Sequence, residues 1–293
     1  MQQQQRASVH GQLGHLNQRV LVFGGPYSNL AATRAMAARA LDLGLEPDHI
    51  ICSGDIVAYC GEPAETVELI RDWGIHVVMG NCEESLAASE PDCGCGFEPG
   101  SSCSALAVNW YRYADERVSP AQRRWMQALP RSIDFEMAGR RFKVIHGSLD
   151  RINQFVFASD DAIAKRAQLD AAGADIIVGG HAGIPFGQTL DNGWWLNAGV
   201  IGMPANDGSP RVWYMLIEEA AGKLEISWHR LEYDFAVSSA STVAAGMPEY
   251  GQALQSGLWP SMDILPAAER AQQGHPLDLP PISIPTNSLA DSA

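Results

Sequence analysis

Short apolar runs and longer helical segments alternate along the first third of the chain. The apolar runs at 19–23, 49–53 and 76–79 are of strand length, and a glycine directly follows each of them. The segments 30–43 and 63–73 between them have helical spacing, and the second opens with a proline, which the first turn of a helix tolerates. The order strand, helix, strand, helix, strand predicts a parallel sheet in an α/β domain.

Beyond residue 104 the pattern becomes mixed. Two apolar segments joined at Ala138-Gly139 indicate an antiparallel hairpin, and a buried strand ends at Gly179-Gly180-His181. Shorter strands then alternate with turns. Helices are expected around 105–113, 120–129 and 158–172, and strands at 132–136, 141–145, 175–178, 188–190, 194–196, 211–217 and 224–231.

Composition sets the expected boundaries. A chain of 293 residues is long enough for one large α/β domain, which we expect at 19–235, interrupted by a Cys- and Gly-rich insertion at 91–104. The Gln-rich segment 1–18 has no apolar stretch typical of a secretory signal and is expected to be a disordered leader. The Ala-, Pro- and Gly-rich segment 236–293 is expected to form a helix and an extended tail that wraps the domain, disordered near its end.

Four predicted strands end in a glycine beside a polar residue, namely Gly54-Asp55, Gly80-Asn81, His146-Gly147 and Gly180-His181. Loops that follow parallel strands meet at one edge of a sheet, so we expect these polar side chains to converge there. One carboxylate, one amide oxygen and two imidazoles suit Mn, Fe or Zn better than Mg or Ca. Each pair alone is common in turns or in a hydrogen-bonded core, but the four together are far more specific.

The same blocks resemble a known family. Together with Val20 to Leu30, they resemble the ordered motifs of the calcineurin-like metallophosphoesterases, and small bacterial phosphodiesterases in particular. The segment 197–202 also resembles the block that follows the last metal motif of that family. The resemblance covers roughly residues 19–217 and implies a four-layer αββα sandwich around two mixed β-sheets.

The resemblance also implies a ligand set. In that family two metal ions share a bridging aspartate, which Asp55 matches. One of the two ions is further held by an asparagine and two histidines, and Asn81, His146 and His181 match these. That site is therefore expected to be complete.

The ligands of the other ion are missing together. Gly25 and Tyr27 stand where the family has an aspartate and a histidine, and Gly183 replaces a third histidine. Cys82 stands where the family often has the histidine proposed to protonate the leaving group. A two-metal site holds its ions about 3.5–4 Å apart and shares the work of activating water between them. This chain is expected to have a reduced, mononuclear site.

Two residues beside this site, Tyr27 and Asn29, each have two possible roles. Tyr27 is either a phenolate ligand, which favours a trivalent ion, or a buried or substrate-facing side chain. Asn29 either contacts the phosphate of a substrate or caps the helix that begins at Leu30.

The loop with Cys93, Cys95 and Cys103 also allows several interpretations. With Cys82 these residues would make a four-thiolate metal site. Alternatively, the loop folds over the active edge and places a sulfur in the vacated metal position. The third interpretation is a reduced surface loop with incidental thiols. Because the chain lacks a secretory signal, we expect thiols in a reducing cytoplasm and no disulfide framework.

Net charge and hydropathy limit the kinds of molecule that the protein is expected to bind. The net charge is −14, which argues against general binding of nucleic acid or anionic membranes but allows a small phosphorylated substrate. No run of about 18 apolar residues suggests a membrane span. The segment Gly257 to Pro260, with Trp259, either docks a neighbouring subunit or covers the edge of the site, which leaves a homo-oligomer open.

Three functions follow as expectations. The first is a cytoplasmic metal-dependent hydrolase of phosphate mono- or diesters, in which a metal held by Asp55, Asn81, His146 and His181 binds the phosphate and supplies the attacking hydroxide. Cys82 or a substrate-bound water would then serve the leaving group. The second is a catalytically inactive metal- or ligand-binding protein on the same fold, and the third is a metal or redox sensor acting through the cysteine loop.

Overall fold

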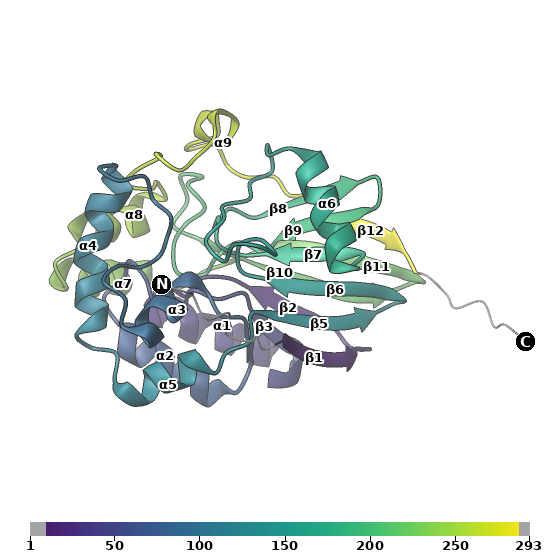
Figure 1. Ribbon diagram of the computed structural model, residues 1–293, viewed down its shortest axis with the longest axis horizontal. Coiled ribbons are helices and arrows are strands. Elements are labelled where there is room, and N and C mark those ends of the chain that lie inside the picture. The colour runs from purple at the N-terminus through teal and green to yellow at the C-terminus, as the bar shows by residue number, and fades with distance from the viewer. Residues whose placement is uncertain (1–9, 287–293) are drawn as a thin grey trace, which may run out of the picture.

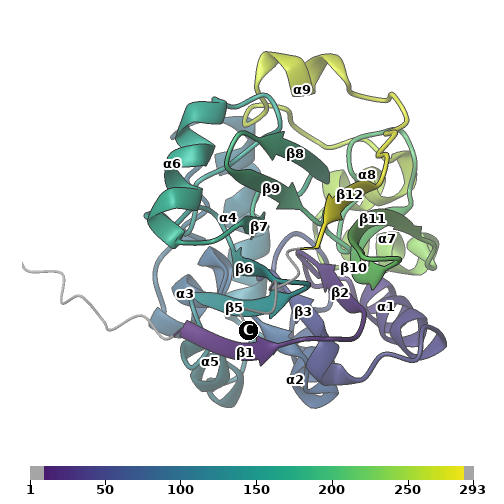
Figure 2. The same ribbon diagram turned by 90° about the vertical axis from the view of Figure 1, so that its right-hand side faces the viewer.

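Two six-stranded sheets pack face to face in the computed structural model, which describes residues 10–286 (Figure 1, Figure 2). The first sheet has the order β1 (His10–His15), β5 (Ser132–Met137), β6 (Arg140–Ile145), β7 (Ile176–Gly179), β9 (Gly193–Asn197), β8 (Phe186–Leu190). The second has the order β12 (Ile282–Pro285), β11 (Lys223–Leu231), β10 (Val212–Ala220), β2 (Val20–Phe23), β3 (Ile50–Cys52), β4 (His76–Val77). Both are mixed: β2 is parallel to β3 and antiparallel to β10, and β6 is parallel to β7 and antiparallel to β5.

Helices cover the outer faces of the two sheets. Helix α1 packs against β11 and α7, and α6 packs against β9 of the other sheet. The helices are α1 (Leu30–Asp42), α2 (Pro63–Trp73), α3 (Asn81–Ala88), α4 (Ser102–Asp115), α5 (Pro120–Gln127), α6 (Ala162–Ala172), α7 (Phe235–Ala244), α8 (Pro248–Ser256) and α9 (Ala267–Ala271). A short 3₁₀ helix, Pro47–His49, precedes β3.

Three apolar interfaces hold the layers together, and strand β2 contributes side chains to two of them. Successive side chains of a strand point to opposite faces. Val20 and Val22 therefore lie in the cluster between the two sheets, while Leu21 and Phe23 face α1 and α2. A third cluster joins the other sheet to α6. These interfaces separate four layers, which confirms the expected αββα sandwich.

The expected disordered leader is wrong for residues 10–15. This segment forms β1, which runs parallel to β5 at the edge of the first sheet. Its polar, Gly-containing sequence HGQLGH gives no strand signal of its own, because the pairing with β5 supplies the backbone partners. Residues 1–9 lie outside the described part of the chain.

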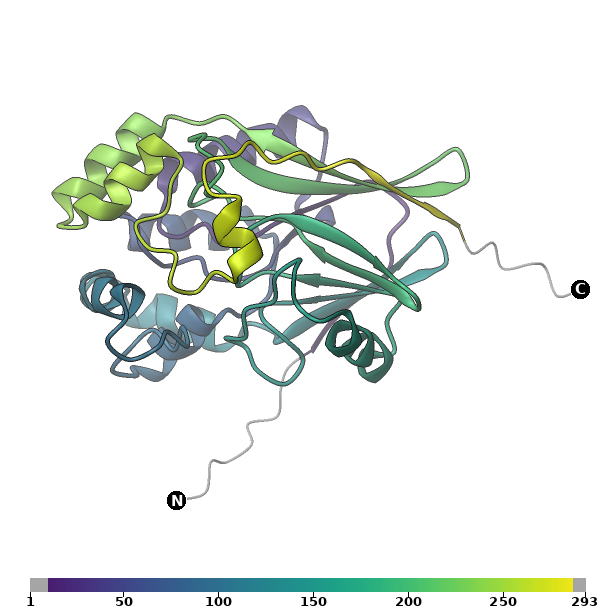
Figure 3. The ribbon, with the colours of Figure 1, turned by 90° about the horizontal axis from the view of Figure 1, so that it is seen from above.

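The C-terminal segment contains more structure than the expected single helix. It forms α7, α8, α9 and finally β12, which pairs with β11 and completes the second sheet. Figure 3 shows the stretch from α8 to β12 crossing over the molecule, with α9 on top. Segments outside 19–235 thus complete both sheets, and the predicted disorder at the end falls on residues 287–293, outside the described range.

Two further observations concern the helices. Helix α3, which begins at Asn81, is absent from the sequence prediction, and it places Asn81 and Cys82 in its first turn. No helix within residues 10–286 is long and apolar enough to cross a membrane.

Candidate metal centre

The four side chains expected to converge do so in a buried cluster. Asp55 follows β3, Asn81 opens α3, His146 follows β6, and His181 follows β7. The Nε2 atom of His146 lies 3.2 Å from Asp55 Oδ2, 3.1 Å from Asn81 Oδ1 and 3.1 Å from His181 Nδ1. The last of these contacts brings the two rings together edge to face. All four side chains are buried.

Hydrogen bonds on the outer side of the cluster fix which atoms face inward. His146 Nδ1 lies 2.7 Å from the carbonyl oxygen of Ser53, and His181 Nε2 lies 3.3 Å from that of Cys95. A carbonyl only accepts, so both outer nitrogens carry the proton. Each inner nitrogen, His146 Nε2 and His181 Nδ1, then presents a lone pair to the centre.

The amide of Asn81 is oriented in the same way. Its Nδ2 donates to the carbonyl of Cys93 over 3.0 Å, which turns Oδ1 toward His146. When His146 is neutral, four lone pairs face one point, where a cation would relieve their mutual repulsion. Asp55, His146 and His181 have ligand atoms within 4.8 Å of one another, and they are the one such group of His, Cys, Asp and Glu among residues 10–286. The donor set fits a transition metal ion.

The protonation states of Asp55 and His181 favour this fit, whereas that of His146 opposes it. Burial by itself raises the pKa of Asp55, but His146 and His181 outweigh burial and hold it well below its usual range. Burial lowers the pKa of His181, so its imidazole is neutral. Burial also acts to lower the pKa of His146, but the Asp55 carboxylate reverses this and raises it. A proton on His146 therefore competes with a metal ion for the same lone pair.

Glu83 positions two of the ligand loops, a role that the sequence analysis missed. This carboxylate is fully buried and accepts from the backbone N–H groups of Asp55 at 2.8 Å and Gly80 at 2.9 Å. Its other oxygen accepts from the N–H of Ile56 at 2.8 Å. Asp55 has a left-handed backbone with φ of 56°, which these bonds stabilise. Glu83 is the third residue of α3, and a glutamate at that place is a known capping signal.

The Tyr27 ring lies beside Gly25 and Gly183, two positions at which the resemblance to the family implies a missing metal ligand. A Cβ atom added to Gly25 would lie 2.5 Å from Tyr27 Cζ, and one added to Gly183 would lie 3.6 Å from the Tyr27 hydroxyl. The ring is buried and meets Tyr59 edge to face. Burial, followed by the charge of Asp55, raises the pKa of Tyr27 well above its usual value. In the metal-free protein Tyr27 is therefore a buried, protonated phenol.

Asn29 caps α1, as one of its two alternatives predicted. Its Oδ1 accepts from the N–H of Ala32 at 3.1 Å and from the hydroxyl of Ser238 at 2.6 Å. Its Nδ2 donates to the carbonyl of Gly202 at 3.1 Å. These bonds engage both ends of the amide, and the Asn29 side chain is fully buried.

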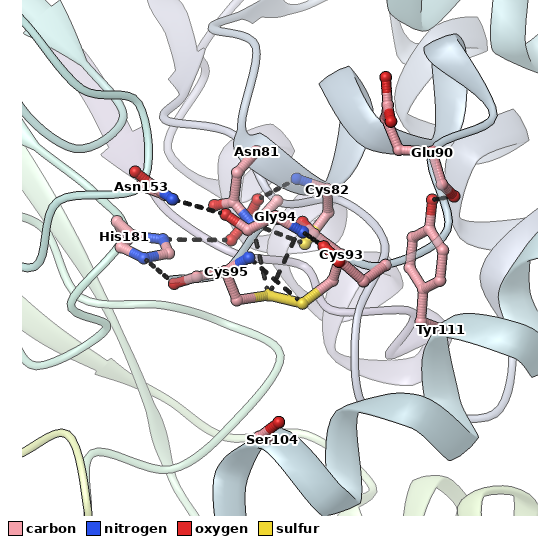
Figure 4. Close-up of a disulfide and its surroundings, with 12 residues drawn as sticks. Asn81, Cys82, Glu90, Cys93, Gly94, Cys95, Ser104, Tyr111, Asn153 and His181 are labelled. Carbon is pink, nitrogen blue, oxygen red and sulfur yellow. Dashed lines mark hydrogen bonds and ion pairs between the residues drawn. A yellow bond between two sulfur atoms is a disulfide. The ribbon is translucent and has the colours of Figure 1, made fainter. Parts of the chain in front are cut away.

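The expectation of free thiols in the cysteine loop is wrong for two of its members. Cys93 and Cys95 form a disulfide with Cα atoms 5.3 Å apart, and both residues are buried (Figure 4). Cys103 is a free, half-buried thiol on α4. The disulfide leaves Cys93 and Cys95 without free thiolates for a four-thiolate metal site. The loop does fold over the cluster, because the carbonyls of Cys93 and Cys95 accept from Asn81 and His181.

Cys82 lies beside the ligands as a buried thiol. Its backbone N–H donates to Asp55 Oδ1 over 3.2 Å, and its sulfur is 3.5 Å from Asn81 Nδ2. Burial, with the charge of Asp55 next in size, raises its pKa well above the usual value. Cys82 is therefore protonated, as a donor to a leaving group must be.

A small apolar cavity of about 60 Å³ adjoins the cluster. His181 lies in its wall, and Phe155 packs on that ring with centroids 4.2 Å apart. Trp259 also lines the cavity and donates its Nε1–H to the carbonyl of Pro204. The segment around Trp259 thus covers the edge of the site, one of the two roles expected of it. No lysine or arginine lies among the lining residues, which otherwise include Tyr27, Tyr59, Phe97, Cys103, Leu106, Ala182, Met203, Tyr250, Pro260, Ser261 and Ile264.

Comparisons with known proteins agree with this geometry. The profile of the calcineurin-like phosphoesterase superfamily domain matches residues 20–221. An uncharacterised protein of Methanocaldococcus jannaschii is 26% identical over 246 residues, covering 79% of this chain and 94% of that protein. A metallophosphoesterase structure from Sphaerobacter thermophilus is 24% identical with a TM-score of 0.61, over 83% of this chain and 100% of the other. A hypothetical protein structure from Pyrococcus horikoshii is 16% identical with a TM-score of 0.66, over 82% and 99%.

Proposed function

The chain belongs to the calcineurin-like phosphoesterase superfamily, and from this premise we propose that it is a hydrolase of phosphate mono- or diesters that works with a single metal ion. The observation that carries the proposal is the convergence of four inward-facing lone pairs in one buried cluster. Such a set is costly to bury unless a cation compensates it. Asp55, Asn81, His146 and His181 would hold the ion.

The single ion is supported by what surrounds the other position. Gly25, Tyr27 and Gly183 offer none of the carboxylate and imidazole ligands of the family, and the Tyr27 ring takes up the space in front of both glycines. A ligand side chain at Gly25 would overlap that ring. The three changes are thus one coupled replacement of a metal by an aromatic ring.

The proposed hydrolysis also needs a metal ion that activates water, groups that orient the ligands and a proton donor for the leaving group. A bound Mn, Fe or Zn ion supplies Lewis acidity toward a phosphoryl oxygen and lowers the pKa of a water molecule. Ser53 and Cys95 orient the two histidines through their carbonyls, and neither ring is free to act as a base while it is a ligand. Cys82, a protonated thiol beside Asp55 and Asn81, would donate the proton to the leaving oxygen, with a substrate-bound water as the other source.

The character of the substrate follows from charge and lining. A chain with a net charge of −14 repels polyanions, so we propose a small phosphorylated molecule and no nucleic acid. The cavity next to His181 carries no basic side chain that would bind a second phosphate. The ester group that faces this cavity is therefore proposed to be uncharged and apolar.

A specific observation favours a second candidate, a metal- or ligand-binding protein without turnover. The ligands are almost inaccessible, since even His181 is only 7% exposed. The cavity beside it, at about 60 Å³, is far smaller than the several hundred Å³ typical of substrate pockets.

Turnover distinguishes the two candidates. The hydrolysis of p-nitrophenyl phosphate and of bis-p-nitrophenyl phosphate is measured with added Mn, Fe or Zn for the wild type, His181→Ala and His275→Ala. His275 is an exposed histidine far along the chain and serves as the matched control. The proposal expects the wild type and His275→Ala to turn over at least one ester and His181→Ala to fall to background. A wild type that binds metal but is no faster than His181→Ala would establish the second candidate instead.

A further inference from the structure

The disulfide-closed turn Cys93-Gly94-Cys95 supplies the hydrogen-bond acceptors that orient two of the four ligands (Figure 4). The carbonyl of Cys93 accepts from Asn81 Nδ2 at 3.0 Å, and that of Cys95 accepts from His181 Nε2 at 3.3 Å. These bonds leave Asn81 Oδ1 and His181 Nδ1 facing the centre. The turn therefore contacts two of the proposed metal ligands directly, on the side of each ligand that faces away from the centre.

The turn is anchored on both sides. The carbonyl of Gly94 accepts from Asn153 Nδ2 at 2.9 Å, and its N–H donates to Asp92 Oδ1 at 2.9 Å. A Cβ atom at Gly94 would lie 2.8 Å from Ser85 Oγ on α3, so the turn presses closely on that helix. The disulfide closes a ring with only Gly94 between its two cysteines, which leaves the carbonyls of Cys93 and Cys95 few alternative directions.

The Cys93-Gly94-Cys95 turn lines a cavity through which a small reductant would reach the disulfide. Both cysteines are buried at 4% and 3% exposure, yet Cys93, Gly94 and Cys95 form part of the wall of a cavity of about 800 Å³. Tyr111 and Arg112 of α4 also line that cavity. A space of this size is within the range that admits small molecules. The turn is therefore the partition between an open cavity and the metal centre.

We propose that the Cys93–Cys95 disulfide is a redox-sensitive positioning element that sets the metal affinity of the centre. The proposal rests on the metal centre proposed above. A dithiol reductant attacks one sulfur as its thiolate, and its second thiol then resolves the mixed disulfide. Two electrons and two protons pass to Cys93 and Cys95, which become thiols, and the reductant becomes the disulfide. The opened turn no longer holds both carbonyls, and Asn81 and His181 lose their fixed orientation.

The expected effect is a weaker metal site in the reduced protein. Loss of the hydrogen-bond partners behind metal ligands typically weakens metal binding by about 10–100-fold. Disulfides in a cytoplasm are mostly transient or redox-sensing. In that compartment, reduction of the Cys93–Cys95 disulfide would lower the fraction of chains that hold a metal ion.

The test measures zinc affinity of the full chain by competition with a chromogenic chelator. Oxidised protein is compared with protein reduced by a phosphine, which is then removed under nitrogen. Thiol titration of the unfolded chain should give four thiols before reduction and six after it, since one disulfide joins two of the six cysteines. We expect zinc binding to weaken by about 10–100-fold on reduction.

Two variants sharpen this comparison. The double variant Cys93→Ser/Cys95→Ser should bind zinc as weakly as the reduced wild type and should not respond to the phosphine. Cys60→Ser removes a free cysteine outside the turn and outside the cavity next to His181, and it should behave like the wild type in both states. Circular dichroism melting establishes that each variant is folded.

Three results would overturn the proposal. Equal affinity in both redox states would refute the positioning role while leaving the metal centre intact. Tighter binding after reduction would mean that the thiols are themselves ligands, which also refutes it. Wild type that binds no more zinc than His181→Ala in either state would remove the metal centre and this inference with it.

Discussion

At the scale of single residues, the four candidate ligands could be predicted from the sequence, but the groups that orient them could not. Asp55, Asn81, His146 and His181 stand at strand ends beside glycines, a pattern visible in one dimension. The partners of these residues are mostly backbone carbonyls from distant loops, and a carbonyl leaves no mark on a sequence. Tyr27 likewise gives no hint that its hydroxyl reaches Gly183, because that depends on how two segments far apart in the sequence pack together.

Glu83 gives the first prediction at this scale. Glu83→Gln replaces one accepting oxygen by an amide that faces backbone donors, so buried N–H groups at Asp55 or Gly80 lose their partner. We expect the free energy of unfolding in urea to fall by about 1–3 kcal/mol. Glu84→Gln is the matched control: this neighbour makes a partly exposed ion pair with Arg131, and its loss should cost at most about 1 kcal/mol. Equal effects of the two substitutions would contradict the role of Glu83.

A second prediction about single residues concerns Gly25. Gly25→Asp restores the residue type of the family, but its Cβ would meet the Tyr27 ring and its backbone has φ of 32°. Overpacking of this kind should lower the free energy of unfolding by about 1–3 kcal/mol. In the double variant Gly25→Asp/Tyr27→Ala the clash is absent, so the two substitutions should couple favourably in a double-mutant cycle. Strictly additive effects would show that Tyr27 does not occupy that space.

A third prediction follows from the competition between a proton and a metal ion for His146. Because Asp55 raises the pKa of His146 above its usual value, the metal-free His146 begins to bind a proton above about pH 6.5. Metal affinity should therefore fall as the pH drops through this range, approaching about tenfold per pH unit for each proton displaced. Calorimetric titration with zinc between pH 8 and pH 5.5 measures this slope. An affinity independent of pH would contradict a site that contains His146.

At the scale of helices and strands, long apolar patterns predicted the elements well, and short polar ones failed. Helix α2 was predicted at its observed bounds because Pro63 and an apolar stripe mark it. Helix α3 was missed because its sequence NCEESLAA is short and has little apolar periodicity, and it is held by Glu83 and by packing on α5. Strand β1 was missed because its stability comes from β5.

Lys165 supports a prediction at this scale, since it ties α6 to the turn before it and to β8. Its ammonium donates to the carbonyl of Phe157 at 2.6 Å and to Gln188 Oε1 at 2.6 Å, and the residue is buried. Lys165→Met would leave these acceptors without a partner and should cost about 1–3 kcal/mol of unfolding free energy. Arg166→Met, at the neighbouring half-buried position, removes an ion pair with the exposed Asp191 and should cost less than about 1 kcal/mol. Denaturation midpoints that shift equally for both would argue against this anchoring.

At the scale of the whole molecule, the sandwich brings four strand ends from two sheets to one place. Asp55 and Asn81 come from the sheet that holds β3 and β4, while His146 and His181 come from the sheet that holds β6 and β7. The metal centre therefore bridges the two sheets and depends on their face-to-face packing. The sequence predicted this layout through its resemblance to the family, whereas the added edge strands β1 and β12 required the structure.

We propose that this chain holds one metal ion where the resemblance to its family implies two. The most direct measurement is the metal content per chain of protein saturated with Mn, Fe or Zn and then freed of excess ion, determined by elemental analysis. The account predicts one ion per chain in the wild type and none in Asp55→Ala, with His275→Ala unchanged. Two ions per wild-type chain, or one that survives Asp55→Ala, would contradict it.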